Sequence, residues 1–213
     1  YTGFRGLASH GAAIAVIVAM YFYSKKVIKK PMLWILDRVV IPVASGAIFV
    51  RIGNFINSEI IGKEVTDFPL GVQFLKESIG ARQATIITKI KDPNKAYDAI
   101  ANDPVFAETL ASVPFRHPAQ LYESFGYVFV FLTLLYFYWK TDKSKQLGFL
   151  FGLFLVLLWT VRFFVEFVKE AQVDTRGDWL LNTGQWLSIP FVLCGVYFMV
   201  QSYKKTYNSD SLS

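Results

Sequence analysis

Five apolar stretches constrain this chain more than any other feature of its sequence. They cover residues 6–23, 32–56, 119–139, 148–168 and 185–202. A helix crosses a bilayer with roughly 17–25 mostly apolar residues, and soluble proteins bury only single helices of this kind. A chain of 213 residues that is 54% hydrophobic fits the same class. The sequence therefore predicts an all-α polytopic membrane protein with about five transmembrane helices.

The basic residues predict how the chain is oriented. If the five stretches alternate in direction, three segments fall on one side: 24–31 with four Lys, 140–147 with three and 201–213 with two. The opposite loop, 169–184, has two basic and three acidic residues. Lys-rich loops mark the cytoplasmic side, so we expect residues 57–118 to be extracytoplasmic. Because these Lys lie in short loops without interleaved aromatic residues, we expect no nucleic-acid binding.

A long polar insert divides the chain into three parts. Residues 1–56 hold two transmembrane helices, 57–118 form the insert, and 119–213 hold three further helices and a cytoplasmic tail. The chain begins at Tyr1 without an initiator Met. We expect it to be an N-terminally incomplete piece of a longer protein.

The insert itself predicts a small α+β head. The segment ATIITKI, residues 84–90, has the β-branched composition of a strand. Asp92 and Pro93 are typical of the cap and first residue of a helix. We expect Asp103 and Pro104 to break that helix into two short ones.

The segment RIGNFINSE, residues 51–59, places polar side chains at the end of the second apolar stretch. Arg51 and Asn54 are three residues apart, so they share a helix face, and Gly53 leaves room beside them for a ligand or another helix. Asn57 and Glu59 follow. Such groups are costly to bury in lipid, so they reach water or bind something. For Arg51 the alternative is an arginine that extends to the lipid headgroups.

A second pair of charges, Arg162 and Glu166, lies at the same depth in the fourth stretch. Their spacing of four residues puts them on one helix face. Charges inside a membrane are expensive, so each requires a partner. The pair either neutralises itself within the bundle or belongs to a shared site.

The two histidines also fall near the outer ends of their stretches. His10 lies in the first stretch, where a lone histidine on an apolar helix is more often a packing residue than a catalyst. His117 begins the third stretch and is followed by Gln120, Tyr122 and Glu123. The two arginines, the histidines, the glutamates and the amides together predict a polar cavity that opens to the outer leaflet.

The residue types in this cavity predict its ligand. Guanidinium groups match the oxygens of a phosphate, and a histidine can move a proton at neutral pH. We therefore expect a phospholipid headgroup site with acid–base chemistry. Two histidines and the single Cys194, which lies within an apolar stretch, are too few to hold a zinc ion, so we expect no metal.

At these residues the sequence resembles the bacterial prolipoprotein diacylglyceryl transferases. Residues 51–66, RIGNFINSEIIGKEVT, match the family signature of an arginine, x-Gly-Asn-Phe-x-Asn-x-Glu and a nearby glycine and threonine. Four further blocks occur in the family's order: HG at 10–11, RHPAQLYES at 116–124, RFFVEF at 162–167 and GQWLSIP at 184–190.

The resemblance implies a multi-pass enzyme of the bacterial cell (inner) membrane. Such an enzyme transfers the diacylglyceryl group of phosphatidylglycerol to the lipobox cysteine of a prolipoprotein signal peptide, and it releases glycerol phosphate. This is the first step of lipoprotein maturation, and it needs no cofactor. The resemblance makes Arg51 the phosphatidylglycerol-binding arginine, Arg162 a second essential arginine and His10 the base that activates the thiol. The other residues expected to contact substrate are Asn54, Asn57, Glu59, Glu166, His117, Gln120 and Tyr122.

Two other functions fit the same residues. A transporter or flippase for anionic phospholipids also needs arginines at headgroup depth, although broken half-helices and repeats are more typical of that class. A non-catalytic lipid-binding membrane protein retains the arginines without the base.

Overall fold

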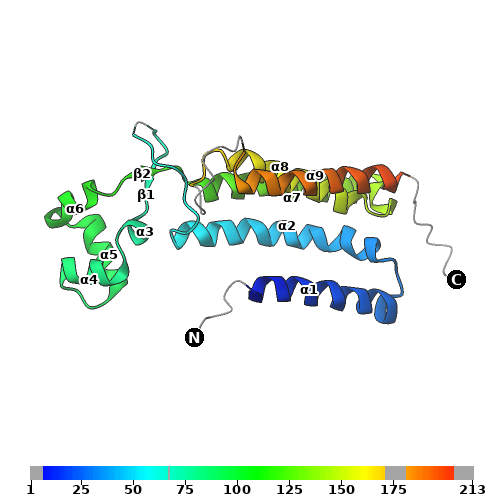
Figure 1. The fold of residues 1–213 in the computed structure, drawn as a ribbon, viewed down its shortest axis with the longest axis horizontal. Coiled ribbons are helices and arrows are strands. Elements are labelled where there is room, and N and C mark those ends of the chain that lie inside the picture. The colour runs from blue at the N-terminus through cyan, green and yellow to red at the C-terminus, as the bar shows by residue number, and fades with distance from the viewer. Residues whose placement is uncertain (1–6, 67, 171–180, 204–213) are drawn as a thin grey trace.

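The computed structural model describes residues 7–66, 68–170 and 181–203, and they are mostly helical. Four long helices run side by side, and a small head lies at one end of them (Figure 1). The four are α2 (Met32–Ile56), α7 (Ala119–Lys140), α8 (Phe149–Val165) and α9 (Thr183–Ser202). A further helix, α1 (Leu7–Phe22), continues through the π-helix η1 (Tyr23–Ile28) toward α2. The end of the four-helix bundle beside the head is called the head end, and the opposite end the far end.

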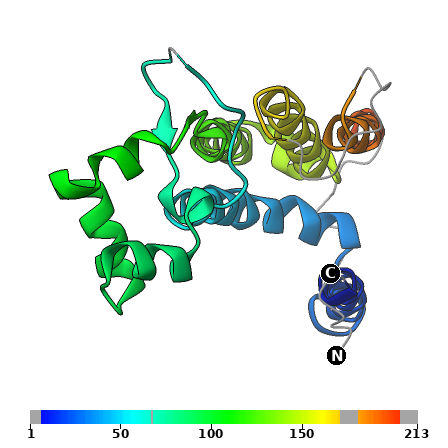
Figure 2. The ribbon, with the colours of Figure 1, turned by 60° about the vertical axis from the view of Figure 1, so that its left-hand side comes forward.

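The helices of the bundle pack in chain order. Helix α2 contacts α7 and α8, α7 contacts α8, and α8 contacts α9, whereas α1 stands apart from α7, α8 and α9 (Figure 2). Nine buried apolar residues form the core: Val40, Ala44, Val130, Leu134, Phe149, Leu150, Leu153, Phe154 and Leu155. Large apolar side chains also cover the outside of the bundle, as at Phe125, which is 80% exposed. Such a surface is typical of helices that face lipid.

Three of the described helices, α2, α7 and α9, are long and apolar enough to cross a membrane. Helix α8 is apolar but has 17 residues, because it ends at Val165 and residues 166–168 form a turn. Helix α1 has 16 residues. The described residues therefore contain three candidate spans, which agrees with the predicted membrane protein. The predicted number of five transmembrane helices is not confirmed.

Helices α8 and α9 approach each other closely where two glycines meet. A Cβ on Gly195 would lie 2.6 Å from the carbonyl oxygen of Gly152, so the contact requires glycine. Nearer the head end, Trp159 and Phe191 stack with ring centroids 4.1 Å apart. These contacts fix the register of the two antiparallel helices.

At the far end, a buried carboxylate from α2 caps the start of α8. Asp37 accepts hydrogen bonds from the backbone N–H groups of Gly148, at 2.6 Å, and Phe151, at 2.8 Å. The first N–H groups of a helix have no partner within it and carry partial positive charge. Asp37 therefore satisfies donors that would otherwise be buried without partners, and it ties α2 to α8.

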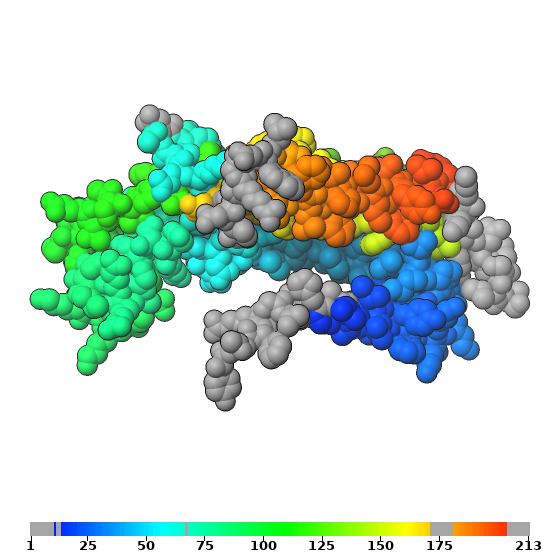
Figure 3. All heavy atoms as spheres, in the orientation of Figure 1, coloured from blue at the N-terminus to red at the C-terminus, as the bar shows by residue number. Residues whose placement is uncertain are grey.

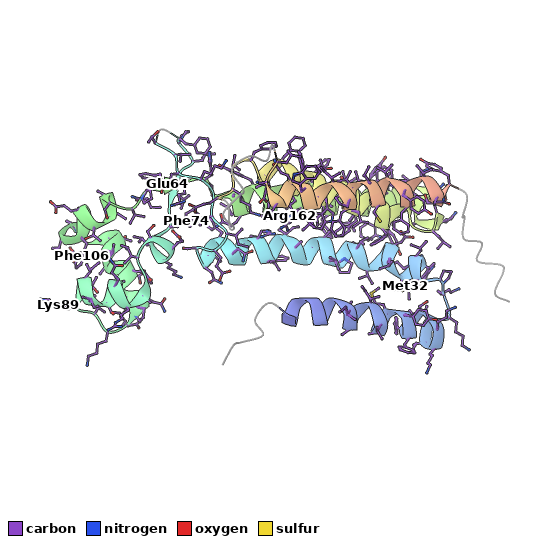
Figure 4. All side chains as sticks on the ribbon, viewed as in Figure 1. Met32, Glu64, Phe74, Lys89, Phe106 and Arg162 are labelled. Carbon is purple, nitrogen blue, oxygen red and sulfur yellow. The ribbon has the colours of Figure 1, made fainter. Side chains whose placement is uncertain are left out.

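The head projects as a separate lobe from the bundle (Figure 3). Its elements are β1 (Val72–Gln73), α3 (Leu75–Ser78), α4 (Ala81–Thr88), α5 (Pro93–Asn102), the 3₁₀-helix η2 (Pro104–Phe106), α6 (Ala107–Ala111) and β2 (Phe115–Arg116). The two strands pair antiparallel, and a core of Ile79, Ala84, Ala96, Ile100 and Val113 joins the helices. Phe74 lies where the head meets α2 (Figure 4), with its ring centroid 5.7 Å from that of Phe55.

Two sequence predictions in the head are confirmed and one is wrong. The side chain of Asp92 accepts a hydrogen bond from Asn94 at the start of α5, and the helix ends before Asp103, whose side chain caps η2. The predicted strand 84–90 is not formed: residues 84–88 belong to helix α4, and Lys89 ends that helix. Burial explains the difference: Ala84 is buried and Ile87 packs on the same core three residues later, which is a helical spacing. Tertiary contact has overridden β propensity.

An antiparallel joint connects the head to the bundle. It consists of residues 61–65, paired on one side with 115–117 and on the other with 168–170. Gly62 N–H donates to the carbonyl of His117 and His117 N–H to that of Lys63, both at 3.0 Å. The joint therefore holds the segments that leave α2, enter α7 and leave α8 side by side over the head end.

Candidate active site

Arg51 and Glu123 form a buried ion pair between α2 and α7 at the head end. The Nε atom of Arg51 lies 2.8 Å from Oε2 of Glu123, and the two side chains are 12% and 0% exposed. Nη1 of Arg51 also donates to Oδ1 of Asn54 at 3.4 Å, which confirms that Arg51 and Asn54 share a helix face. The guanidinium is thus positioned by an ion pair with Glu123 and a long hydrogen bond to Asn54.

A second cation, Lys169, shares the same carboxylate. Its Nζ atom lies 3.2 Å from Oε1 of Glu123 and 3.7 Å from Oε2 of Glu166. The antiparallel joint places Lys169 there, since its backbone bridges that of Gly62. The Lys169 side chain is 5% exposed, so its charge depends on these two carboxylates for compensation.

The amides of the signature segment extend this network toward the head. Nδ2 of Asn54 donates to Oε2 of Glu59 at 2.9 Å, and Nε2 of Gln120 donates to the backbone carbonyl of Glu59 at 2.6 Å. Gln120 is fully buried, and its Oε1 atom has no hydrogen-bond partner. Asn57 lies at the end of α2 with an exposed side chain that joins none of these contacts. The structure therefore brings Asn54, Glu59 and Gln120 together and leaves Asn57 outside.

Arg162 lies on α8 near the head end (Figure 4). Its guanidinium is 5.3 Å from the centroid of the Trp159 ring, and its Nε atom is buried without a hydrogen-bond partner. The buried Tyr127 of α7 interacts electrostatically with both Arg51 and Arg162. The two arginines that the sequence singled out therefore both lie within electrostatic range of one buried tyrosine.

Glu166 pairs with Lys169 among the described ion pairs, and not with Arg162. Its carboxylate lies directly over Gly184 in the first turn of α9, where an added Cβ would meet the carboxylate carbon at 2.5 Å. The amide of Asn182 donates to the Glu166 backbone carbonyl at 3.2 Å. The self-neutralising pair of Arg162 and Glu166 is therefore absent from the described ion pairs, and Glu166 joins the network of Glu123 through Lys169.

His117 and Tyr122 lie at the edge of the site. Nδ1 of His117 is 3.3 Å from the Tyr122 hydroxyl. His117 also lines an open groove of about 670 Å³ between the joint and the head, together with Glu64, Val65, Thr66, Phe68, Ala111, Val113, Pro114 and Phe115. His117 therefore faces a groove that neither Arg51 nor Arg162 lines. His10 belongs to helix α1, but its side chain lies outside the described residues.

The sequence analysis noted Glu123 near the cavity but gave it no role in the site, and it did not include Lys169. Glu123 is a carboxylate within an apolar stretch, and such a group requires a partner. That signal marks Glu123 as paired, but it does not identify Arg51 and Lys169 as its partners. Lys169 follows Glu166 at helical spacing, yet the turn at 166–168 redirects it toward Glu123.

The cluster can bind an anion that also carries hydroxyl groups. Arg51, Arg162 and Lys169 supply positive charge, and Arg162 retains a buried N–H without a partner. Gln120 contributes a buried oxygen that can only accept a hydrogen bond. Within the described residues, no group of three or more His, Cys, Asp or Glu is arranged to hold a metal ion.

Comparison with known proteins agrees with this chemistry. The family model described as prolipoprotein diacylglyceryl transferase matches residues 2–201. The chain belongs to the prolipoprotein diacylglyceryl transferase family. It is 39% identical over 200 residues to a protein of Tolumonas auensis, covering 94% of this chain, and 38% identical over 205 residues to one of Bacteroides fragilis, covering 96%. A protein of Chloroherpeton thalassium is 37% identical over 202 residues, or 94% of this chain.

All three relatives are named phosphatidylglycerol--prolipoprotein diacylglyceryl transferase. The match spans 64%, 61% and 62% of their respective lengths. The family relationship thus covers nearly all of this chain but less than two thirds of each relative.

Proposed function

We propose that this chain forms the headgroup site of an enzyme that transfers the diacylglyceryl group of phosphatidylglycerol to the lipobox cysteine of a prolipoprotein signal peptide. The observation that carries the proposal is the pair of arginines at the head end: Arg51 is held by Glu123, and the buried Nε–H of Arg162 has no partner. This arrangement suits the phosphate of an anionic lipid. The names of the relatives supply the reaction.

The transfer requires a thiolate and a stabilised leaving group. The sulfur attacks the glyceryl carbon that bears the phosphate, a C–S bond forms, and the C–O bond breaks with its electron pair on the phosphate oxygen. Glycerol phosphate leaves with one more negative charge than the lipid phosphodiester had. Arg51 and Arg162 stabilise that charge as it develops.

The same site provides acceptors for the glycerol hydroxyls of the headgroup. Oε1 of Gln120 is buried without a partner, and the Glu59 carboxylate holds Asn54 beside it. Both groups accept hydrogen bonds from hydroxyls. In this proposal Gln120, Asn54 and Glu59 contact the glycerol, whereas His117, Tyr122 and Asn57 lie toward the peptide.

His10 is proposed as the base that takes the thiol proton. A free thiol has a pKa of about 8.5, so it is mostly protonated at neutral pH, and the thiolate is the nucleophile. His10→Gln should slow transfer by roughly 10²–10⁴-fold near neutral pH. The defect should shrink as the pH approaches the pKa of the free thiol. A defect that is uniform from about pH 6 to 9 would indicate a packing role for His10 instead.

The decisive experiment supplies phosphatidylglycerol vesicles and a synthetic lipobox peptide to the purified protein. The proposal expects the peptide to gain the mass of a diacylglyceryl group on its cysteine, with release of glycerol phosphate. Peptides in which serine replaces the cysteine serve as the control. Movement of lipid between leaflets without an adduct would instead identify a transporter, and lipid binding alone a non-catalytic protein.

We also propose that α1 and α8 cross the membrane with the three longer helices, that the Lys-rich loops are cytoplasmic, and that residues 57–118 form the extracytoplasmic head. The asymmetry of Lys between the loops supports this orientation. Single cysteines at Lys143 and Asp98, in a Cys194→Ala background, can be labelled on intact bacterial cells from which any outer membrane has been removed. An impermeant reagent should label Asp98→Cys, and labelling of Lys143→Cys instead would invert the orientation.

A further inference from the structure

We propose that Gln185 is a phosphate-binding residue of the same site, with its side-chain amide donating to a phosphate oxygen beside Arg162. This inference rests on the proposed function, because it names a further contact to the lipid headgroup. It starts from a buried donor that nothing in the described part of the protein satisfies: Nε2 of Gln185 has no hydrogen-bond partner, and the residue is 3% exposed. A buried amide left without partners is destabilising, so a ligand that accepts from it is favoured.

The helix cap at the start of α9 fixes which atom Gln185 presents. Asn182 N–H donates to Oε1 of Gln185 at 3.0 Å, and Gln185 N–H donates to Oδ1 of Asn182 at 2.9 Å. This reciprocal capping box occupies the amide oxygen. The free atom is therefore the nitrogen, which can only donate, and its ligand must be an acceptor.

Contacts between α8 and α9 place Gln185 in the same section of the bundle as Arg162. The carboxylate of Glu166 lies over Gly184, and Trp159 stacks on Phe191. Arg162 lies between the two α8 residues, and Gln185 lies between the two α9 residues. The section thus holds two buried N–H donors without partners, Nε of Arg162 and Nε2 of Gln185.

Two donors, one of them cationic, select a negatively charged acceptor. A phosphate offers several oxygens, so it can accept from the guanidinium and the amide at once. A headgroup ammonium carries only donors and would be repelled. The same chemistry is present in the lipid phosphodiester and in the released glycerol phosphate, so both should depend on Gln185.

The test uses Gln185→Glu, which keeps an oxygen for the Asn182 N–H and replaces the donor with an acceptor. Gln201→Glu, near the far end of the same helix, is the matched control. Binding of glycerol phosphate and of phosphatidylglycerol nanodiscs is measured by calorimetry, with thermal unfolding alongside. We expect Gln185→Glu to raise both Kd values about 10- to 100-fold, as expected for a hydrogen bond to a charged group. Gln201→Glu should change neither.

Gln185→Met provides a variant without added charge. It removes the donor and the cap together, so it should lower the unfolding temperature and still raise both Kd values about tenfold or more. Unchanged Kd values in Gln185→Glu or Gln185→Met would overturn the inference, as would weaker binding of the lipid with unchanged binding of glycerol phosphate.

Transfer to the lipobox peptide is followed in the same samples. A wild-type protein that binds glycerol phosphate and transfers nothing overturns the proposed function, while the Kd comparison still decides the role of Gln185. A wild-type protein that binds no glycerol phosphate overturns both.

Discussion

The bundle buries a carboxylate at each end, and the two are held in different ways. At the far end Asp37 accepts from two backbone N–H groups at the start of α8, so two uncharged donors satisfy it. At the head end Glu123 lies between Arg51 and Lys169, surrounded by further charges. Unpartnered atoms of Arg162, Gln120 and Gln185 occur at the head end. A buried charge whose neighbouring polar groups all have partners stabilises the fold. A buried charge that lies among polar groups without partners indicates a binding site.

Arg51→Lys at the head end is expected to have the largest effect on transfer activity. An ammonium keeps the charge but cannot contact Glu123, Asn54 and a phosphate with a planar fork. We expect kcat/KM for transfer to fall about 10²–10³-fold, with little change in unfolding temperature. Arg38→Lys, on the same helix near the far end, is the matched control and should leave transfer unchanged. Near-normal transfer by Arg51→Lys would show that Arg51 does not bind the phosphate through two N–H groups.

Asp37→Asn tests the opposite end. The amide places an N–H against a backbone N–H of α8, so one donor loses its acceptor. We expect the free energy of unfolding to fall by about 2–3 kcal/mol, measured by thermal and denaturant unfolding in lipid nanodiscs. Transfer per folded molecule should stay normal. Asp142→Asn removes an exposed carboxylate paired with Lys145 and should change stability little. A transfer defect in Asp37→Asn without instability would mean that the two ends are coupled.

Gly184→Ala sharpens the description of the head end. The added methyl would collide with the Glu166 carboxylate, so Glu166 must shift and its pair with Lys169 must weaken. We expect kcat/KM to fall about tenfold, since misplacing one group of a positioned site is costly. Gly46→Ala, where an added Cβ meets no atom within 4 Å, is the control. Equal transfer by the two variants would show that the position of Glu166 is not important.

The smallest effect is expected from Lys143→Met at the far end. Its Nζ atom lies 5.1 Å from the centroid of the Phe149 ring and 4.4 Å from that of Tyr203. Removing these cation–π contacts should lower the free energy of unfolding by about 0.5–1 kcal/mol. Transfer should not change. A loss of transfer greater than the loss of folded protein would contradict a purely structural far end.

Local features of both ends could be predicted from sequence, and their long-range partners could not. The face shared by Arg51 and Asn54 follows from helix geometry alone, and the structure confirms it. The link from Arg51 to Glu123 joins two helices, and sequence spacing gives no information on how they pack. The same limit explains Asp37, whose partners lie on α8. In the head, composition predicts a strand at residues 84–90, whereas packing against α5 favours the helix that residues 84–88 form.

The antiparallel joint has a consequence for how the chain tolerates change. Gly62, Lys63 and His117 are hydrogen-bonded to one another, so the two ends of the head meet at its base. The head is an insertion whose two ends are held together by hydrogen bonds. The number of residues within it therefore does not set the distance between those ends. Closing a longer insertion costs little more free energy than closing a shorter one. The head can therefore gain or lose residues while the spacing between α2 and α7, and with it the Arg51–Glu123 pair, stays the same.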